Sequence, residues 1–193
     1  MLTELDSLKK RLGVEVTDTV DDTVLENFIL ACTGRFDREC NRKFALVDGA
    51  TYEFDANRAE VLPDRYPIIS VSAWHLKANE TDGWEAQSGV DYLIRRACVI
   101  SLTAPLGSEL EVGRVTYKGG YVLPGSTAGA GETELPDEIE QACIEQCAYW
   151  FQRRNQLGLV SVSGEGGAIS NFAKLDLLPS VSALLEKYNR LVI

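Results

Sequence analysis

LPDEIEQACIEQCAYWFQRR, residues Leu135–Arg154, predicts a long helix over 136–155. Pro136 falls in the first turn, where proline is tolerated because the missing N–H has no intrahelical partner there. Carboxylates follow in the same turn, where they complement the positive end of the helix dipole: Asp137, Glu138 and Glu140. The start of this helix is therefore well defined by the sequence alone.

Apolar residues cover more of this helix than the single face that a surface helix buries. One stripe is formed by Ile139, Cys143, Cys147 and Trp150, and a second stripe by Ile144, Ala148 and Phe151. Such a helix is either central in its own domain or shared with a neighbouring molecule.

Cys143 and Cys147 lie one helical turn apart, so their thiols face the same side of the helix. A structural zinc ion needs four ligands, and the one histidine, His75, lies in a different region of the chain. Cys32 and Cys40 could complete a set of four thiolates, but they are eight residues apart and form no CxxC pair. The pattern favours small buried packing residues, so we expect no metal and no cofactor.

Two further helices are predicted near the start of the chain. In the first, leucines recur at spacings of three and four, Thr3 can cap the helix and Gly13 ends it. The second can be capped by Asp21 or Asp22. Its apolar face consists of Val24, Leu25, Phe28, Ile29, Cys32, Phe36 and Cys40.

Between residues 48 and 125 the pattern changes to short alternating or continuous apolar runs, separated by turn-forming residues. The predicted strands are 50–55, 59–63, 68–77, 90–95, 98–102 and 109–118. Helices followed by strands and again by helices indicate an α+β fold rather than a parallel βαβ sheet. We expect a helical core from 1–47 and 135–157, with a small antiparallel β subdomain inserted over 48–125.

The remaining residues, 158–193, are predicted to form a flexible arm that ends in a short helix. Glycines and serines between 158 and 170 favour neither helix nor strand. The helical stripe that follows consists of Val181, Leu184, Leu185, Tyr188 and Leu191. A short amphipathic helix of this kind can bind a groove on a partner, or it can dock on its own domain.

The composition argues against several classes of function. With 19 basic and 29 acidic residues, the net charge of −10 argues against a surface that grips nucleic acid through its phosphates. Five cysteines in apolar or helical runs favour a reduced, cytosolic setting. The first residues lack the apolar segment of a signal peptide, and no apolar run is long enough to span a membrane.

The sequence contains no recognisable catalytic constellation. The glycine-rich segments 129–132 and 164–167 lack both the lysine and the strand-to-helix setting of a phosphate-binding loop. His75 has no companion motif that supplies a nucleophile or an orienting carboxylate. The alternative from another class is a small enzyme with a deep pocket in the β region, around Trp74, His75, Trp84 and Asp91.

Several segments follow one another in a familiar order: DDTVLENFILAC, RECNRKF, the strand Thr51 to Phe54, LPDRYPIISVSAW, VTYKGGY and LPDEIEQACIEQCAYWFQRR. In this order the chain resembles the phage head-tail connector family, also called adaptor or head-completion proteins. The resemblance covers most of residues 1–154, and its most specific part is RYPIISV and VTYKGGY followed by LPDEIEQA. The chain departs from the family in its long β insertion and in its extension past Gly158.

The resemblance implies a structural virion protein without enzymatic activity, located in the neck between portal and tail, and in the host cytoplasm during assembly. It implies a ring of twelve copies beneath the portal protein, with a channel that passes double-stranded DNA without binding it specifically. The lower face of the ring is expected to receive a tail or neck protein, and no membrane is involved. A neck stopper or tail-completion protein is the alternative within the virion.

A ring uses heterologous contacts, so each subunit needs two different complementary patches. We expect the stripe of Ile144, Ala148 and Phe151, or the adjacent β insertion, to supply part of one patch. The resemblance also implies that the arm 158–193 docks on the portal. The stripe expected to carry this docking is Val181, Leu184, Leu185, Tyr188 and Leu191.

Overall fold

The computed structural model describes residues 1–156, 161–163, 169–171 and 176–190. The chain divides into two compact units. The helical unit comprises Met1–Cys40 and Pro136–Asn189, and the β unit comprises Asn41–Leu135 together with Arg190.

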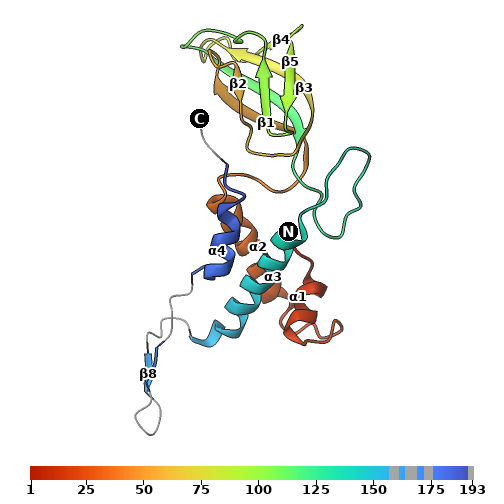
Figure 1. Cartoon of the computed structure of the whole chain (residues 1–193), viewed down its shortest axis with the longest axis vertical. Coiled ribbons are helices and arrows are strands. Elements are labelled where there is room, and N and C mark those ends of the chain that lie inside the picture. Colours follow the sequence, from red (N-terminus) through yellow and green to blue (C-terminus); the bar gives the residue numbers. More distant parts are fainter. Residues whose placement is uncertain (157–160, 164–168, 172–175, 191–193) are drawn as a thin grey trace. The chain divides into compact units, whose positions relative to one another are not determined.

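The helical unit contains the helices α1 (Leu5–Leu12), α2 (Asp22–Glu39), α3 (Asp137–Gln152) and α4 (Pro179–Glu186). Helix α3 contacts each of the other three, so it is the central helix of its unit (Figure 1). The core side chains come from all four helices: Leu8, Leu25, Ile29, Phe36, Ile139, Cys143, Cys147, Val181 and Leu185. The unit also contains a 3₁₀ turn, Arg154–Gln156, and a short antiparallel pair of strands, β8 (Ser161–Ser163) and β9 (Ile169–Asn171).

A buried lysine joins α1 to the start of α2. Lys9 is only 1% exposed, and its Nζ donates to the carbonyl oxygens of Val16 and Asp18 at 3.1 and 2.8 Å. The same nitrogen pairs with Asp22 Oδ1 at 2.5 Å. Burying an ammonium group is costly unless its charge and its hydrogen bonds are satisfied, and here three oxygens surround it.

The β unit is built from antiparallel strands in two sheets. The first sheet has the order β1 (Val47–Asp55), β7 (Val112–Gly119), β3 (Ile68–Lys77) and β4 (Glu85–Gln87). The second has the order β2 (Glu60–Val61), β6 (Val99–Leu102) and β5 (Tyr92–Arg95). The core of this unit includes Val61, Ile68, Trp74, Ile100, Leu102, Val115 and Tyr117.

One buried tyrosine of β7 ties the β unit together. Tyr117 is fully buried; its hydroxyl donates to Asp64 Oδ1 at 2.9 Å and accepts from the backbone N–H of Arg65 at 3.1 Å. Arg65 in turn donates to the carbonyl oxygen of Ala45 at 2.7 Å. Burial raises the pKa of Tyr117, and the nearby Asp64 carboxylate raises it further. The segments LPDRYPIISVSAW and VTYKGGY, which both belong to the sequence resemblance, thus meet in one hydrogen-bonded junction.

The α+β architecture with a small antiparallel β subdomain is confirmed. Strand β3 has the predicted bounds of 68–77, whereas β4 and the pair β8–β9 were not predicted. The prediction that Thr3 caps α1 is wrong: the N-cap residue is Glu4, and Thr3 Oγ1 donates instead to Glu140 Oε1 at 3.1 Å. In the part of the chain that the structure describes, no helix combines the length and apolar character that a membrane crossing requires.

Candidate functional site

The apolar stripe of α3 that was assigned to a subunit interface is buried within the helical unit itself. Ile144, Ala148 and Phe151 are 8%, 6% and 8% exposed in the single chain. The guanidinium group of Arg154 lies 3.7 Å from the centre of the Phe151 ring and covers part of it. These side chains therefore need no neighbouring subunit for their burial, and their role in subunit contacts stays a prediction.

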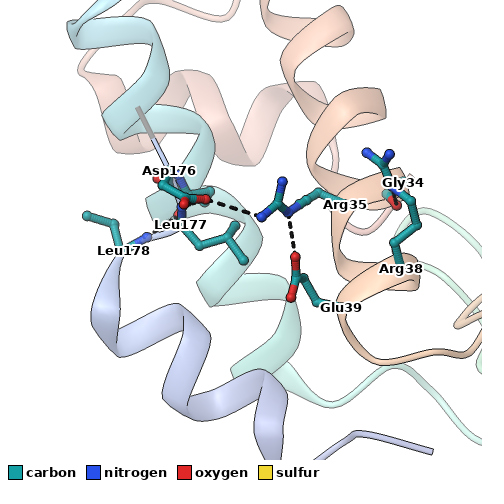
Figure 2. A network of polar contacts seen from close by, with 8 residues as sticks. Gly34, Arg35, Arg38, Glu39, Asp176, Leu177 and Leu178 are labelled. Carbon is teal, nitrogen blue, oxygen red and sulfur yellow. Dashed lines mark hydrogen bonds and ion pairs between the residues drawn. The ribbon is translucent and has the colours of Figure 1, made fainter. Parts of the chain in front are cut away.

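Helix α4 packs on α3 and α2, and a polar network holds the start of α4 there. Gln146 of α3 is fully buried; its Oε1 accepts from the backbone N–H of Leu178 at 2.8 Å, and its Nε2 donates to the carbonyl oxygen of Asp176 at 3.2 Å. Arg35 of α2 pairs with Glu39 and with Asp176, as Figure 2 shows. The two nitrogen–oxygen distances are 2.7 and 3.2 Å. Both α2 and α3 therefore bind the segment that starts α4.

The residues of the predicted portal-docking stripe do not share one environment. Val181 and Leu185 are 1% and 2% exposed and belong to the core of the helical unit, which agrees with the alternative that this helix docks on its own domain. Leu184 and Tyr188 are partly exposed, and the Tyr188 hydroxyl donates to Glu138. Leu191 lies outside the described residues.

A groove of about 380 Å³ runs between α3 and α4 on the helical unit. Its lining is Glu138, Gln141, Ala142, Glu145, Ser180, Val181, Ala183, Leu184 and Lys187. The lining thus combines apolar residues with two glutamates of α3 and with Lys187, which follows α4. Such a surface suits an apolar side chain of a partner with a basic residue beside it.

The structure does not bring the residues of the alternative enzyme site together in a pocket. Trp74 is buried against Phe54 and Tyr92, while His75 follows it on β3 and therefore points to the opposite face of the sheet. The Trp84 ring stacks with the guanidinium of Arg114 at 3.7 Å. A groove of about 500 Å³ does exist in the β unit, between β1 and residues 58–62, but none of the four residues lines it.

Two leucines of the β unit are the surface feature that the sequence did not reveal. Leu93, on the edge strand β5, is 61% exposed, and Leu110, in the turn before β7, is 91% exposed. Both fell inside predicted strands, where alternation alone does not say which face is covered. Leu110 escapes burial because β7 begins only at Val112.

The helical unit also contains a cluster of three thiols. Cys32 of α2 and Cys143 and Cys147 of α3 are buried, and their Sγ atoms all lie within 4.8 Å of one another. Hydrogen bonding to the other two thiols, together with burial, raises the pKa of Cys32, and a hydrogen bond with Cys147 raises the pKa of Cys143. The thiolate of Cys147 accepts from Cys143 and Cys32, which lowers its pKa.

Comparison with known proteins gives a fold but no family. No protein-family model matches the chain, and no curated protein matches it. The chain is similar to one in a solved structure of the neck of an empty gene transfer agent (GTA) particle, computed with C6 symmetry. The TM-score is 0.64 and the identity 16%, over 100% of this chain and 91% of that one.

A second similar chain comes from a structure of the virion of a native gene transfer agent particle. Here the TM-score is 0.59 and the identity 12%, again over 100% of this chain and 91% of that one. At such identities the similarity establishes a shared fold and no more than the fold.

Proposed function

We propose that this chain is a structural subunit of the neck of a tailed-phage-like particle, where it forms an adaptor ring beneath the portal. The ring extends the DNA channel and offers the docking surface for a tail or neck protein. The observation that carries the proposal is the fold, which this chain shares over its whole length with a chain from a particle neck. The order of sequence segments typical of head-tail connectors supports the same role.

The charge of the protein suits a conduit for DNA. Residues 48–135 contain 13 acidic and 7 basic residues, a net charge of −6 within the total of −10. Acidic walls repel phosphates, so a duplex passes along them without being held. A protein that had to bind DNA would need the opposite balance.

We place the ring contact on the β unit, because Ile144, Ala148 and Phe151 are already buried within the helical unit. Leu93 and Leu110 are the large apolar side chains with the greatest exposure among the described residues of this unit. Apolar side chains exposed singly are common on monomers, but interface cores are enriched in apolar residues and depleted in charge. We propose that Leu93 and Leu110 are covered by a neighbouring copy.

We propose that α4 serves portal docking through its outward side. Val181 and Leu185 fix the helix on the helical unit, while Leu184 and the α3–α4 groove face outward and remain accessible. Deleting residues 174–193 is therefore a poor test of docking, because it also removes core side chains. A Leu184→Glu substitution changes the groove without removing the helix from the core.

The proposed copy number is twelve. A ring of twelve identical subunits contains a sixfold axis, so it is compatible with the C6 symmetry under which the similar neck was computed. A ring of six copies is compatible with that symmetry as well, and counting the subunits in images of the ring distinguishes the two.

Replacing Leu93 and Leu110 together by aspartate should prevent ring formation while leaving the chain folded. Both side chains are exposed, so the free energy of unfolding should change by less than about 0.5 kcal/mol per site. Two carboxylates buried without partners at each subunit contact should nevertheless block assembly. The measurement is native mass spectrometry and negative-stain imaging of the chain mixed with its portal protein.

The matched control for this experiment is the double variant Thr51→Asp and Thr103→Asp, which adds the same charge at exposed polar sites of the β unit. The control should assemble like the unmodified chain. Rings of unchanged yield from the leucine variant would remove Leu93 and Leu110 from the interface, and a complete absence of rings from the unmodified chain on its portal would contradict the adaptor role.

A further inference from the structure

The cluster of Cys32, Cys143 and Cys147 has the dimensions of a metal site with three sulfur ligands. All three Sγ atoms lie within 4.8 Å of one another. A zinc–thiolate bond is about 2.3 Å long, which places pairs of sulfur ligands about 3.8 Å apart in a tetrahedral site and about 4.0 Å apart in a trigonal one. Small rotations of the cysteine side chains, which move each sulfur atom by a fraction of an ångström, would bring the sulfur–sulfur distances to these values.

The surroundings of the cluster specify the kind of ion. The three residues are 0% exposed, so a bound ion is held inside the helical unit. Thiolates are soft ligands and select ions such as Zn²⁺, Cd²⁺ or Cu⁺ over Mg²⁺ and Ca²⁺. Three thiolates leave a net charge of −1 around a divalent ion and −2 around a monovalent one, and burial penalises the larger charge.

We propose that Cys32, Cys143 and Cys147 bind one thiophilic divalent d¹⁰ ion, with Zn²⁺ as the ion available in a cell. On binding, each S–H bond still present in the cluster breaks, three metal–sulfur bonds form and the released protons pass to the solvent, with no change of oxidation state. The ion would join α2 to α3, so its binding stabilises the helical unit.

The chain itself provides the controls for this site. Cys40 is also buried on α2, but its thiol lies apart from the cluster and donates to the carbonyl oxygen of Leu185 at 3.5 Å. Cys98 belongs to the β unit and is partly exposed. Neither residue has a role in the proposed site, so replacing them separates a specific site from general thiol chemistry.

The experiment is a Cd²⁺ titration of the full chain, refolded in a phosphine reductant so that burial does not block access of the ion. The expected result is a sulfur-to-cadmium charge-transfer band in the ultraviolet that saturates at one equivalent, with a higher midpoint of thermal unfolding. Zn²⁺ should displace Cd²⁺ and remove the band. Cys32→Ser, Cys143→Ser and Cys147→Ser should each weaken binding at least tenfold, whereas Cys40→Ser and Cys98→Ser should match the unmodified chain.

Circular dichroism separates loss of the site from loss of the fold, and alanine variants at the same three positions replace any serine variant that does not fold. The proposal would be overturned if Cd²⁺ binding still saturated at one equivalent after Cys143 and Cys147 were replaced. It would also be overturned if the folded, reduced chain gave no charge-transfer band with Cd²⁺. Either result leaves the adaptor proposal untouched, because the neck role does not depend on a metal.

Discussion

Gly120→Ala is expected to unfold the β unit, with a loss of at least about 3 kcal/mol in its free energy of unfolding. Gly120 has a φ of +110°, a conformation that residues with a side chain rarely adopt. A methyl group built there lies 2.6 Å from the carbonyl carbon of Ala45 and 2.7 Å from the nitrogen of Leu46. These are backbone atoms, so no side-chain rotation relieves the clash.

The backbone around Gly120 has little freedom to move away. The backbone N–H of Gly120 donates to the carbonyl oxygen of Pro67 at 2.9 Å. The N–H of Tyr121 donates to the carbonyl oxygen of Phe44 at 2.7 Å, and the carbonyl oxygen of Tyr121 accepts from the N–H of Leu46 at 2.8 Å. A shift that accommodates the methyl group breaks these hydrogen bonds, which lie where the β unit begins and where β7 has just ended.

Gly49→Ala is the matched control for this experiment. Gly49 also has a positive φ, +77°, but nothing lies within 4 Å of the position of an added methyl group. Its replacement should cost only about 1 kcal/mol, the strain of a left-handed residue. Hydrogen–deuterium exchange across a denaturant series measures both variants, with peptides of the β unit losing protection first. Equal stabilities for the two variants would contradict the close packing at Gly120.

Phe151→Asp is expected to destabilise the helical unit by at least about 3 kcal/mol. The ring is buried under Arg154, and its loss leaves a cavity. A carboxylate replaces it near the end of α3, where the helix dipole disfavours negative charge. The effect should appear in the isolated chain, before any assembly.

Gln141→Asp provides the comparison on the same helix. Gln141 is exposed near the start of α3, so this variant should change the free energy of unfolding by less than about 0.5 kcal/mol. Urea unfolding followed by circular dichroism distinguishes the two. If Phe151→Asp instead left the isolated chain as stable as Gln141→Asp and prevented only ring formation, Phe151 would belong to the subunit interface after all.

The helices and the β insertion could be predicted because their signals are local. The 3.6-residue spacing in 22–39, and Pro136 with the acidic residues after it, define α2 and α3 within a few residues. The alternation in IISVSAWHLK defines β3. The short strand β4 pairs only with three residues of β3, and no comparable pattern marks it in the sequence.

The partners of an apolar surface could not be predicted, because they depend on contacts between distant residues. The width of the α3 stripes showed that this helix needed several packing partners but not that α4 would be one of them. That partner is held by Gln146 and Asp176, 30 residues apart in the sequence. Likewise, the spacing of Cys143 and Cys147 indicated two neighbouring thiols, whereas the third, Cys32, is 111 residues away from Cys143.

The most direct test of the central claim is cryo-electron microscopy of whole particles, reconstructed at the neck with and without imposed symmetry. The account predicts a ring of twelve copies immediately below the portal, into which both units of this fold can be placed, with acidic surface toward the DNA. Density for this fold one layer further from the portal would indicate a stopper or tail-completion protein instead. Particles with a complete neck that lacks this fold would contradict the account.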